Sequence, residues 1–338
     1  MPITAISLVS LQSVDKLQAI LQTSPYPLRF ELSYEMSRPL LDSMRPLLHD
    51  SVVSVHAPCP NTEFFPNLAS NDASVIRQSY KDLQLSLETT VSFGGSIMVL
   101  HPGYATDLAI PSHNQRRQEI LSGAEFHPYI WKEAGSICIP SYLQTGHYLG
   151  YKANAMANLK QFANACAERG VMLAVENLNP RVGYLFQTPE EMIELVNEVP
   201  ECSLCLDVGH LWISSCLYGF DYYQGIQDIL ATGKVVTTHL HSNSSHPGAD
   251  ERTIRLEDDH ASLDKYQFPY KWIISKIAAS GANMVLEVKE DPLGNYLLLM
   301  QELDQLALSE QNSEAIKHND ATVILTERNL YETSKSHT

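Results

Sequence analysis

The sequence contains no long hydrophobic run, and this excludes a membrane-spanning helix. None of its 338 residues belong to a stretch of about 18 uncharged apolar residues, which such a helix needs. The first residues, MPITAISLVSLQSV, lack the basic region that opens a signal peptide and are typical of a first strand. We therefore expect a cytoplasmic protein without a membrane partner.

Positive charge is also scarce. The chain has 23 Lys and Arg residues against 39 Asp and Glu residues, which gives a formal net charge of −16. A broad electrostatic grip on nucleic acid relies on clustered Lys and Arg, so this balance disfavours such a surface. Divalent cations bound in a pocket would reverse the sign of the charge there.

Cysteine is too rare for a disulfide framework, since the whole chain has six. Cys202 and Cys205 have the spacing of a zinc knuckle or a redox pair, but no second pair accompanies them. Cys205 also lies inside the apolar run that leads to Asp207. We interpret these thiols as buried and inert.

What the sequence does contain is a regular alternation of apolar, β-branched segments with helical stretches. The expected strands are Thr4–Val9, Leu28–Leu32, Val52–His56, Ser96–His101, Val171–Glu176, Ser203–Asp207, Val235–His241 and Met284–Val288. The clearest helical stretches are Ser74–Phe93, Asn154–Arg169, Thr188–Glu198 and Lys271–Ser280. The strands do not alternate clearly between apolar and polar residues, as expected when both faces are covered. The pattern predicts an α/β protein with a single (β/α)₈ TIM barrel over residues 1–310.

Two segments interrupt this pattern. Residues 104–152 form a long insert after the fourth strand, where a loop usually needs only a few residues. The insert is rich in aromatic residues and leaves the catalytic edge of the barrel, so one interpretation is a lid over the pocket. The other is a surface excursion that packs on itself. Residues 311–338 are polar, and we expect a loosely packed C-terminal tail.

Nine side chains of the types that bind metals lie at or near the ends of the predicted strands. They are His56, His101, Glu176, Asp207, His210, His239, Asp258, His260 and Glu287. Side chains at the carboxyl edge of a parallel barrel converge on one point. Five imidazoles and four carboxylates gathered there would be electrostatically intolerable without cations. The sequence therefore predicts a metal cluster at the mouth of the barrel.

Two pairs of candidates are separated by two positions. Residues i and i+2 of an extended segment face the same side, so Asp258 and His260 reach one cluster while Asp259 faces away. His239 and His241 also share a side; we assign His239 as the ligand, and His241 can hold substrate. Four further histidines lie in loops, where solvated or lid residues are expected. They are His113, His127, His147 and His246.

The mixture of ligand types narrows the choice of metal. Imidazole and carboxylate without thiolate suit Zn²⁺, Mn²⁺ or Fe²⁺. One tetrahedral ion needs about four ligands. Nine ligands are therefore enough for two or three ions if some of the carboxylates bridge.

With these residues in view, the chain resembles the xylose isomerase-like TIM barrels, and among them most closely endonuclease IV. The resemblance runs from about Val52 to Val288 and rests on VHAP, PNLAS (66–70), LHPG, VEN, LDVGH, THLH, DxH (258–260) and LEV (286–288). It implies that all nine residues hold three zinc ions, and that Glu176 bridges two of them. Two departures put duplex DNA in doubt as a substrate. The endonucleases have a DNA-inserting Tyr shortly after VHAP where this chain has CPNTEFF (59–65), and the insert has no counterpart there.

Two enzymatic hypotheses follow. The first is a multinuclear hydrolase with two or three zinc ions that acts on a phosphoester of a small molecule or nucleotide. The alternative is an isomerase or epimerase of a sugar or sugar phosphate with one Mn²⁺ or Mg²⁺ held by Glu176, Asp207, His239 and Glu287. In that scheme Glu176 and Glu287 are the catalytic acid–base pair. A metal-dependent binding protein without activity is a third hypothesis, and the number of ligands favours the hydrolase.

Overall fold

The molecule is built on a closed barrel of eight parallel strands, described here from a computed structural model that covers residues 2–48, 50–250 and 252–309. The strands are β1 (Thr4–Ser7), β2 (Phe30–Leu32), β3 (Val52–His56), β4 (Ile97–Leu100), β7 (Met172–Glu176), β8 (Ser203–Asp207), β9 (Val235–Leu240) and β10 (Asn283–Leu286). Each pairs with its neighbour in chain order, and β1 pairs with β10 to close the barrel. The predicted (β/α)₈ fold is confirmed, with all eight expected strands present.

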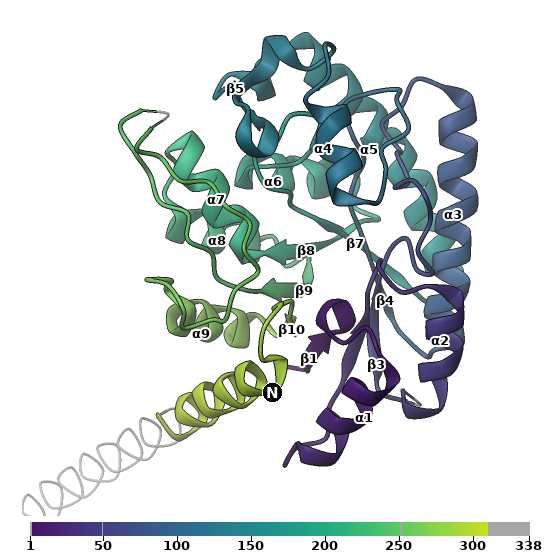
Figure 1. Ribbon diagram of the computed structural model, residues 1–338, viewed down its shortest axis with the longest axis vertical. Coiled ribbons are helices and arrows are strands. Elements are labelled where there is room, and N and C mark those ends of the chain that lie inside the picture. Colours follow the sequence, from purple (N-terminus) through teal and green to yellow (C-terminus); the bar gives the residue numbers. More distant parts are fainter. Residues whose placement is uncertain (1, 49, 251, 310–338) are drawn as a thin grey trace, which may run out of the picture.

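Helices surround the barrel and follow its strands (Figure 1). They are α1 (Val14–Thr23), α2 (Arg38–Met44), α3 (Ala73–Ser92), α5 (Gly146–Ala167), α6 (Pro189–Glu198), α7 (Val208–Tyr218), α8 (Tyr222–Ala231) and α9 (Tyr270–Ser280), and residues 292–309 are also helical. The helix expected over Asn154–Arg169 begins eight residues earlier. The side chain of Thr145 accepts a hydrogen bond from the backbone N–H of Tyr148 and so caps the helix there.

The strands are buried on both faces, which explains their lack of alternation. Every residue of β3 and β4 is buried. All six cysteines are also buried and free of disulfides, as expected. Burial raises the pKa of the Cys202 thiol to about 12, so the Cys202–Cys205 pair supplies no thiolate. Among the described residues, no helix is long and apolar enough to cross a membrane.

The insert after β4 folds into a small layer of its own above the barrel (Figure 1). It contains α4 (Asn114–Leu121) and an antiparallel pair, β5 (Ile130–Lys132) and β6 (Ile137–Cys138). Its aromatic residues pack on one another; for example, the rings of Tyr129 and His147 stack with their centroids 5.0 Å apart. Backbone hydrogen bonds from Ala105 to Gly183 and from Val182 to Ser136 join the insert to the loop after β7. The expected tail, residues 311–338, lies outside the described residues.

Candidate metal centre

The carboxyl edge of the barrel brings all nine candidate residues together. His56, Glu176 and Asp207 are the last residues of β3, β7 and β8, while His101 and Glu287 directly follow β4 and β10. Among the overlapping sets of donor atoms that lie within 4.8 Å of one another, three account for all nine residues. We call them the core group (Glu176, Asp207, His239, Glu287), the histidine group (His56, His101, Glu176) and the outer group (His210, His241, Asp258, His260).

In the core group, one histidine nitrogen faces three carboxylates. Nδ1 of His239 lies 3.4 Å from Oε1 of Glu176 and 3.4 Å from Oε2 of Glu287. Oδ2 of Asp207 lies 3.8 Å from the same nitrogen. This nitrogen is buried and has no hydrogen-bond partner with good geometry among the described residues. A buried, unpartnered nitrogen beside three carboxylates fits a site that holds a divalent cation.

Glu176 stands between the core group and the histidine group. Its Oε2 atom lies 3.0 Å from Nε2 of His56 and 3.5 Å from Nε2 of His101, while Oε1 faces His239. Burial would raise the pKa of the Glu176 carboxyl, but His239, His101 and His210 outweigh burial and hold the pKa well below its usual value. The carboxylate is therefore ionised, with one oxygen directed at each group.

In the outer group, one carboxylate lies between two imidazoles. Oδ2 of Asp258 is 3.5 Å from Nε2 of His210, and Oδ1 is 3.2 Å from Nε2 of His260. Burial opposes a charge on His260, but the neighbouring Asp258 raises the pKa of the imidazole to about 9. Asp258 and His260 reach one group, as expected, while Asp259 accepts a hydrogen bond from the Ser244 hydroxyl instead. The backbone at His260 itself is not extended, since its φ is 48°. Histidine is one of the residue types that enter this left-handed region more readily than most.

Three of the imidazoles have their tautomers fixed by backbone carbonyls. Nδ1 of His56 lies 3.1 Å from the carbonyl oxygen of Ala57, and Nδ1 of His210 lies 3.1 Å from that of Asn177. In His260 the corresponding distance, to the carbonyl of Glu287, is 2.9 Å. A carbonyl can only accept, so each Nδ1 carries a proton and donates it. Nε2 is then the nitrogen left to bind a metal once its own proton is lost.

A buried acid that the sequence pattern did not reveal supports the core group. Oε1 of Glu31, in β2, lies 3.1 Å from Nε2 of His239, and the Ser54 hydroxyl donates to Oε2 at 2.7 Å. Burial would raise the pKa of the Glu31 carboxyl, but His239 and Ser54 bring the net pKa below its usual value. A carboxylate behind a ligating imidazole fixes the ring and raises its basicity. The only sequence signal was an acid inside a short buried strand.

Asparagine side chains hold the segments that carry the candidate ligands. The amide of Asn177 joins β7 to β8, since it accepts from the backbone N–H of Asp207 at 2.8 Å and donates to its carbonyl at 2.9 Å. Asn179 donates to Oδ2 of Asp258 at 3.0 Å. Asn67, from the PNLAS segment, accepts from the N–H of Tyr104 at 2.8 Å. These amides give the VEN and PNLAS motifs a positioning role.

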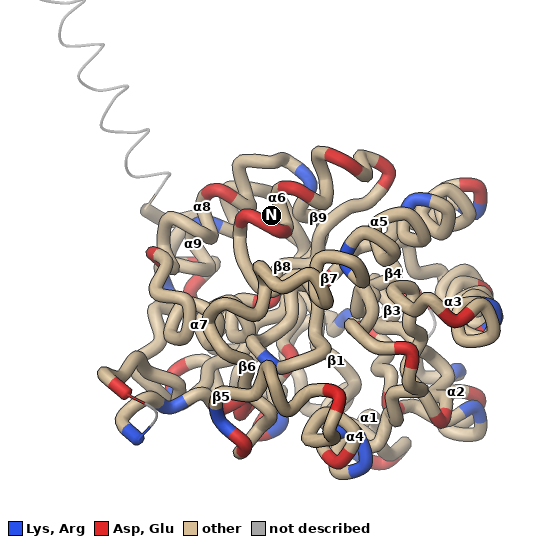
Figure 2. The backbone as a smooth tube through the Cα atoms, turned by 90° about the horizontal axis from the view of Figure 1, so that it is seen from above, with Lys and Arg blue, Asp and Glu red and all other residues tan. Residues whose placement is uncertain are grey.

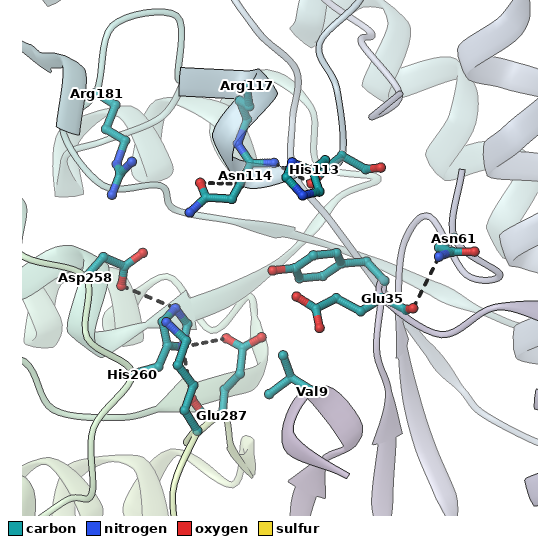
Figure 3. Close-up of a pocket in the computed structure, with 13 residues that line it drawn as sticks. Val9, Glu35, Asn61, His113, Asn114, Arg117, Arg181, Asp258, His260 and Glu287 are labelled. Atoms are coloured by element: carbon teal, nitrogen blue, oxygen red, sulfur yellow. Dashed lines mark hydrogen bonds and ion pairs between the residues drawn. The ribbon is translucent and has the colours of Figure 1, made fainter. Parts of the chain in front are cut away.

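A cavity of about 540 Å³ lies over the centre. From the insert come His113, Asn114 and Arg117, and from the barrel edge come Asp258, His260 and Glu287, which face them across the cavity (Figure 3). A smaller cavity of about 60 Å³ lies at the centre itself and shares Tyr34, Arg117, Asp258, His260 and Glu287 with the larger one. The candidate centre therefore borders a space large enough for a small molecule.

The donor atoms of the nine candidate ligands are nitrogen and oxygen. A further type of donor, the Cys205 thiol, lies close to Glu176 and His239. Burial raises the pKa of this thiol above its usual value, which keeps it protonated. The residues thus fit Zn²⁺, or another ion that accepts imidazole and carboxylate, without thiolate.

These features define a class: a (β/α)₈ barrel with imidazoles and carboxylates gathered at the carboxyl ends of its strands. The chain belongs to the xylose isomerase-like TIM barrel family, whose model matches residues 30–316. The resemblance inferred from the motifs is confirmed at this level. No curated protein sequence matches the chain.

Solved structures of the same fold have low sequence identity. A D-tagatose 3-epimerase-like protein superimposes with a TM-score of 0.64 at 16% identity, covering 91% of this chain and 99% of that one. The TTHB071 protein from Thermus thermophilus, soaked with ZnCl₂, gives 0.55 at 17% identity, covering 89% and 98%. An AP endonuclease, family 2, from Brucella melitensis gives 0.54 at 14% identity, covering 86% and 93%.

Proposed function

We propose that the protein is a divalent-metal-dependent hydrolase that cleaves a phosphoester of a small molecule or nucleotide, with two or three zinc ions as cofactors. The observation that carries the proposal is the position of Glu176, whose two carboxylate oxygens face two different groups of candidate ligands. With the outer group beside them, the donors suffice for more than one ion. An isomerase with a single ion needs only the core group.

In the proposed reaction the bound ions and the protein side chains have different roles. When bound, divalent cations lower the pKa of a coordinated water and neutralise charge on the phosphoryl oxygens. The chain supplies the positions: Glu176 spans two groups, and Glu31 holds His239 from behind. The ordered asparagines keep the ligand-bearing loops in place, so little reorganisation is needed when substrate arrives.

The cavity suits a small anionic substrate. Three cationic residues line it, Arg117 from the insert, Arg181 from the loop after β7 and Lys289 from the segment after β10. Of these, Arg117 also lines the smaller cavity at the centre. A guanidinium there can form paired hydrogen bonds to phosphate oxygens. Arg117 is thus the residue that we assign to hold the substrate phosphate.

The insert is proposed to act as a lid, with α4 covering the cavity. Residues His113, Asn114 and Arg117 reach the cavity from above, where a DNA duplex would have to approach. Lys and Arg positions are scattered between acidic ones (Figure 2), and the net charge is −16. Both features favour a small molecule over duplex DNA.

A second candidate function is isomerisation or epimerisation of a sugar or sugar phosphate. It is favoured by the core group, in which Glu176 and Glu287 each lie 3.4 Å from Nδ1 of His239 and so border one ion position. One Mn²⁺ or Mg²⁺ there, with the two glutamates as an acid–base pair, would satisfy that mechanism. The solved structures that share this chain's fold include a D-tagatose 3-epimerase-like protein.

The two functions are separated by assaying the zinc-loaded and the manganese-loaded protein on two substrate panels. One panel contains phosphomonoesters and phosphodiesters, including nucleotides; the other contains ketoses and ketose phosphates. We expect hydrolysis of a phosphoester, measured as phosphate from monoesters or as the alcohol and monoester products of diesters, that falls at least about 100-fold in His56→Ala and Asp258→Ala, because ligands of a multinuclear centre act together. His246→Ala, in an exposed loop, is the matched control. Epimerisation that survives both substitutions would overturn the proposal.

A further inference from the structure

His241 lies inside the candidate centre, although its spacing from His239 suggested a role in holding substrate. It directly follows β9, is fully buried, and belongs to the outer group with His210, Asp258 and His260. Its ring stacks on that of His260, with the centroids 4.0 Å apart. A buried imidazole in such a position must find partners for both of its nitrogens.

Only one of these nitrogens has a protein partner among the described residues. Nε2 lies 3.1 Å and 3.2 Å from the two carboxylate oxygens of Asp207, which can only accept a proton at this contact. Nε2 is therefore the protonated nitrogen. Nδ1 keeps its lone pair, and it is buried without a hydrogen-bond partner in the described part of the chain. A carboxylate on one nitrogen and an unsatisfied lone pair on the other is the arrangement of a metal-ligating histidine.

The chain also makes room for this ring. Gly209, in the LDVGH motif, packs directly against it, and a Cβ at that position would overlap the imidazole of His241. Any side chain larger than hydrogen would displace the imidazole. Gly209 therefore leaves space for the imidazole of His241. Neither helix α7 nor the contacts of Asp207 and His210 require a glycine at this position.

We propose that His241 is a protein ligand of the outer group and gives that group four protein donors. This inference rests on the multinuclear centre of the proposed function. Four protein ligands fill the coordination sphere of Zn²⁺, which is typical of a structural site, whereas catalytic sites have three and keep a position open. The outer group is then a closed site, and the histidine group, with three donors, is the open one.

The contact with Asp207 links two of the groups. Asp207 belongs to the core group, and its carboxylate also orients His241 in the outer group. If the outer group held a cation, His241 would be held in place by it, and His241 would in turn hold Asp207. The closed site would thus support the geometry of the core group.

The test is the zinc content of His241→Ala. Wild-type protein and variant are loaded with Zn²⁺, freed of excess ion, and titrated with a chelator of known affinity. We expect the variant to lose one zinc ion per chain, or to bind its weakest ion at least about 10-fold less tightly, while the other ions remain. His246→Ala, a nearby exposed histidine, should bind zinc like the wild type. Unchanged zinc content and affinity in His241→Ala would overturn the inference.

Two further variants keep the outcome interpretable. Gly209→Ala leaves every donor in the sequence but displaces His241, so it should weaken zinc binding in the same way. Asp258→Ala removes a donor of the outer group whatever the role of His241. If Asp258→Ala loses an ion and His241→Ala does not, only the inference about His241 is wrong. If neither substitution changes zinc binding, the outer group holds no ion and the proposed multinuclear centre fails as well.

Discussion

Nε2 of His56 lies 3.0 Å from Oε2 of Glu176, although the two residues are 120 positions apart in the chain. The contact joins the end of β3 to the end of β7, across the intervening strand β4. It leaves the other oxygen of the carboxylate free to face His239. A single carboxylate at this position can serve two cations, and the proposed multinuclear centre depends on it.

The first prediction concerns this bridging position. Glu176→Gln keeps the size of the side chain but removes its charge and one acceptor. We expect zinc binding by both the core and the histidine groups to weaken by about 10- to 100-fold or more, because both lose a charged donor. Isothermal titration with Zn²⁺ measures this. The control is Glu168→Gln, an exposed glutamate just after α5. Weaker binding of only one zinc ion would show that Glu176 does not bridge two ions.

The second prediction concerns Glu31 as a positioning residue. Glu31→Gln retains the shape behind His239 but loses the charge that stabilises the ring as a ligand. Zinc affinity of the core group should fall by about 10- to 100-fold, the usual effect of removing such a partner. Glu31→Asp, which keeps the charge, should recover part of the affinity. Equal affinity in all three proteins would contradict the assigned role.

The third prediction concerns the insert. Arg117→Ala should raise KM for the phosphorylated substrate by about 10- to 100-fold, since a charge-assisted contact contributes about 1.5 to 3 kcal/mol. Zinc content should not change, because Arg117 belongs to none of the ligand groups. Arg117→Lys should recover little if a paired contact to phosphate is required. Arg116→Ala, its exposed neighbour, is the control. A KM unaffected by Arg117→Ala would remove the residue from the binding site.

The fourth prediction concerns the pH dependence of stability without metal. The pKa of His260 is raised from 6.5 to about 9, so its contribution is complete below pH 6.5 and is lost as the pH rises through about 9. The pKa of Asp258 is lowered well below 3.8, so its contribution is present above pH 3.8 and is lost at lower pH. The Tm of chelator-treated protein should fall between pH 6.5 and 9. In zinc-loaded protein the ion replaces the proton, and the fall should be smaller. Parallel Tm curves for the two forms would contradict this.

Much of the barrel could be predicted because its strands are apolar and β-branched and carry their ligand-type residues at the end where parallel strands converge. His56, Glu176 and Asp207 are the clearest cases, since each is the last residue of its strand. The motifs around these residues resemble those of the xylose isomerase-like TIM barrels, and this resemblance pointed to the same residues. Position along the chain was therefore sufficient to predict that these residues lie close together at one edge of the barrel.

Other features depend on tertiary contacts that spacing does not express. Glu31 stands in a three-residue strand, and its role becomes visible only when β9 brings His239 to within 3.1 Å. The surroundings of His239 and His241 also depend on tertiary contacts, because the two residues belong to different groups. His239 lies within β9, and His241 lies just beyond its end. Similarly, Arg117 reaches the cavity because of how the insert docks on the loop after β7, and no local pattern predicts that docking.

Elemental analysis tests most directly whether the centre holds more than one ion. The protein is purified without chelator, its metals are identified, and the content per chain is measured again after loading with Zn²⁺ and removal of excess ion. We expect two or three zinc ions per chain, and three if each ligand group holds its own. A single manganese or magnesium ion, with no further zinc taken up on loading, would contradict the multinuclear centre.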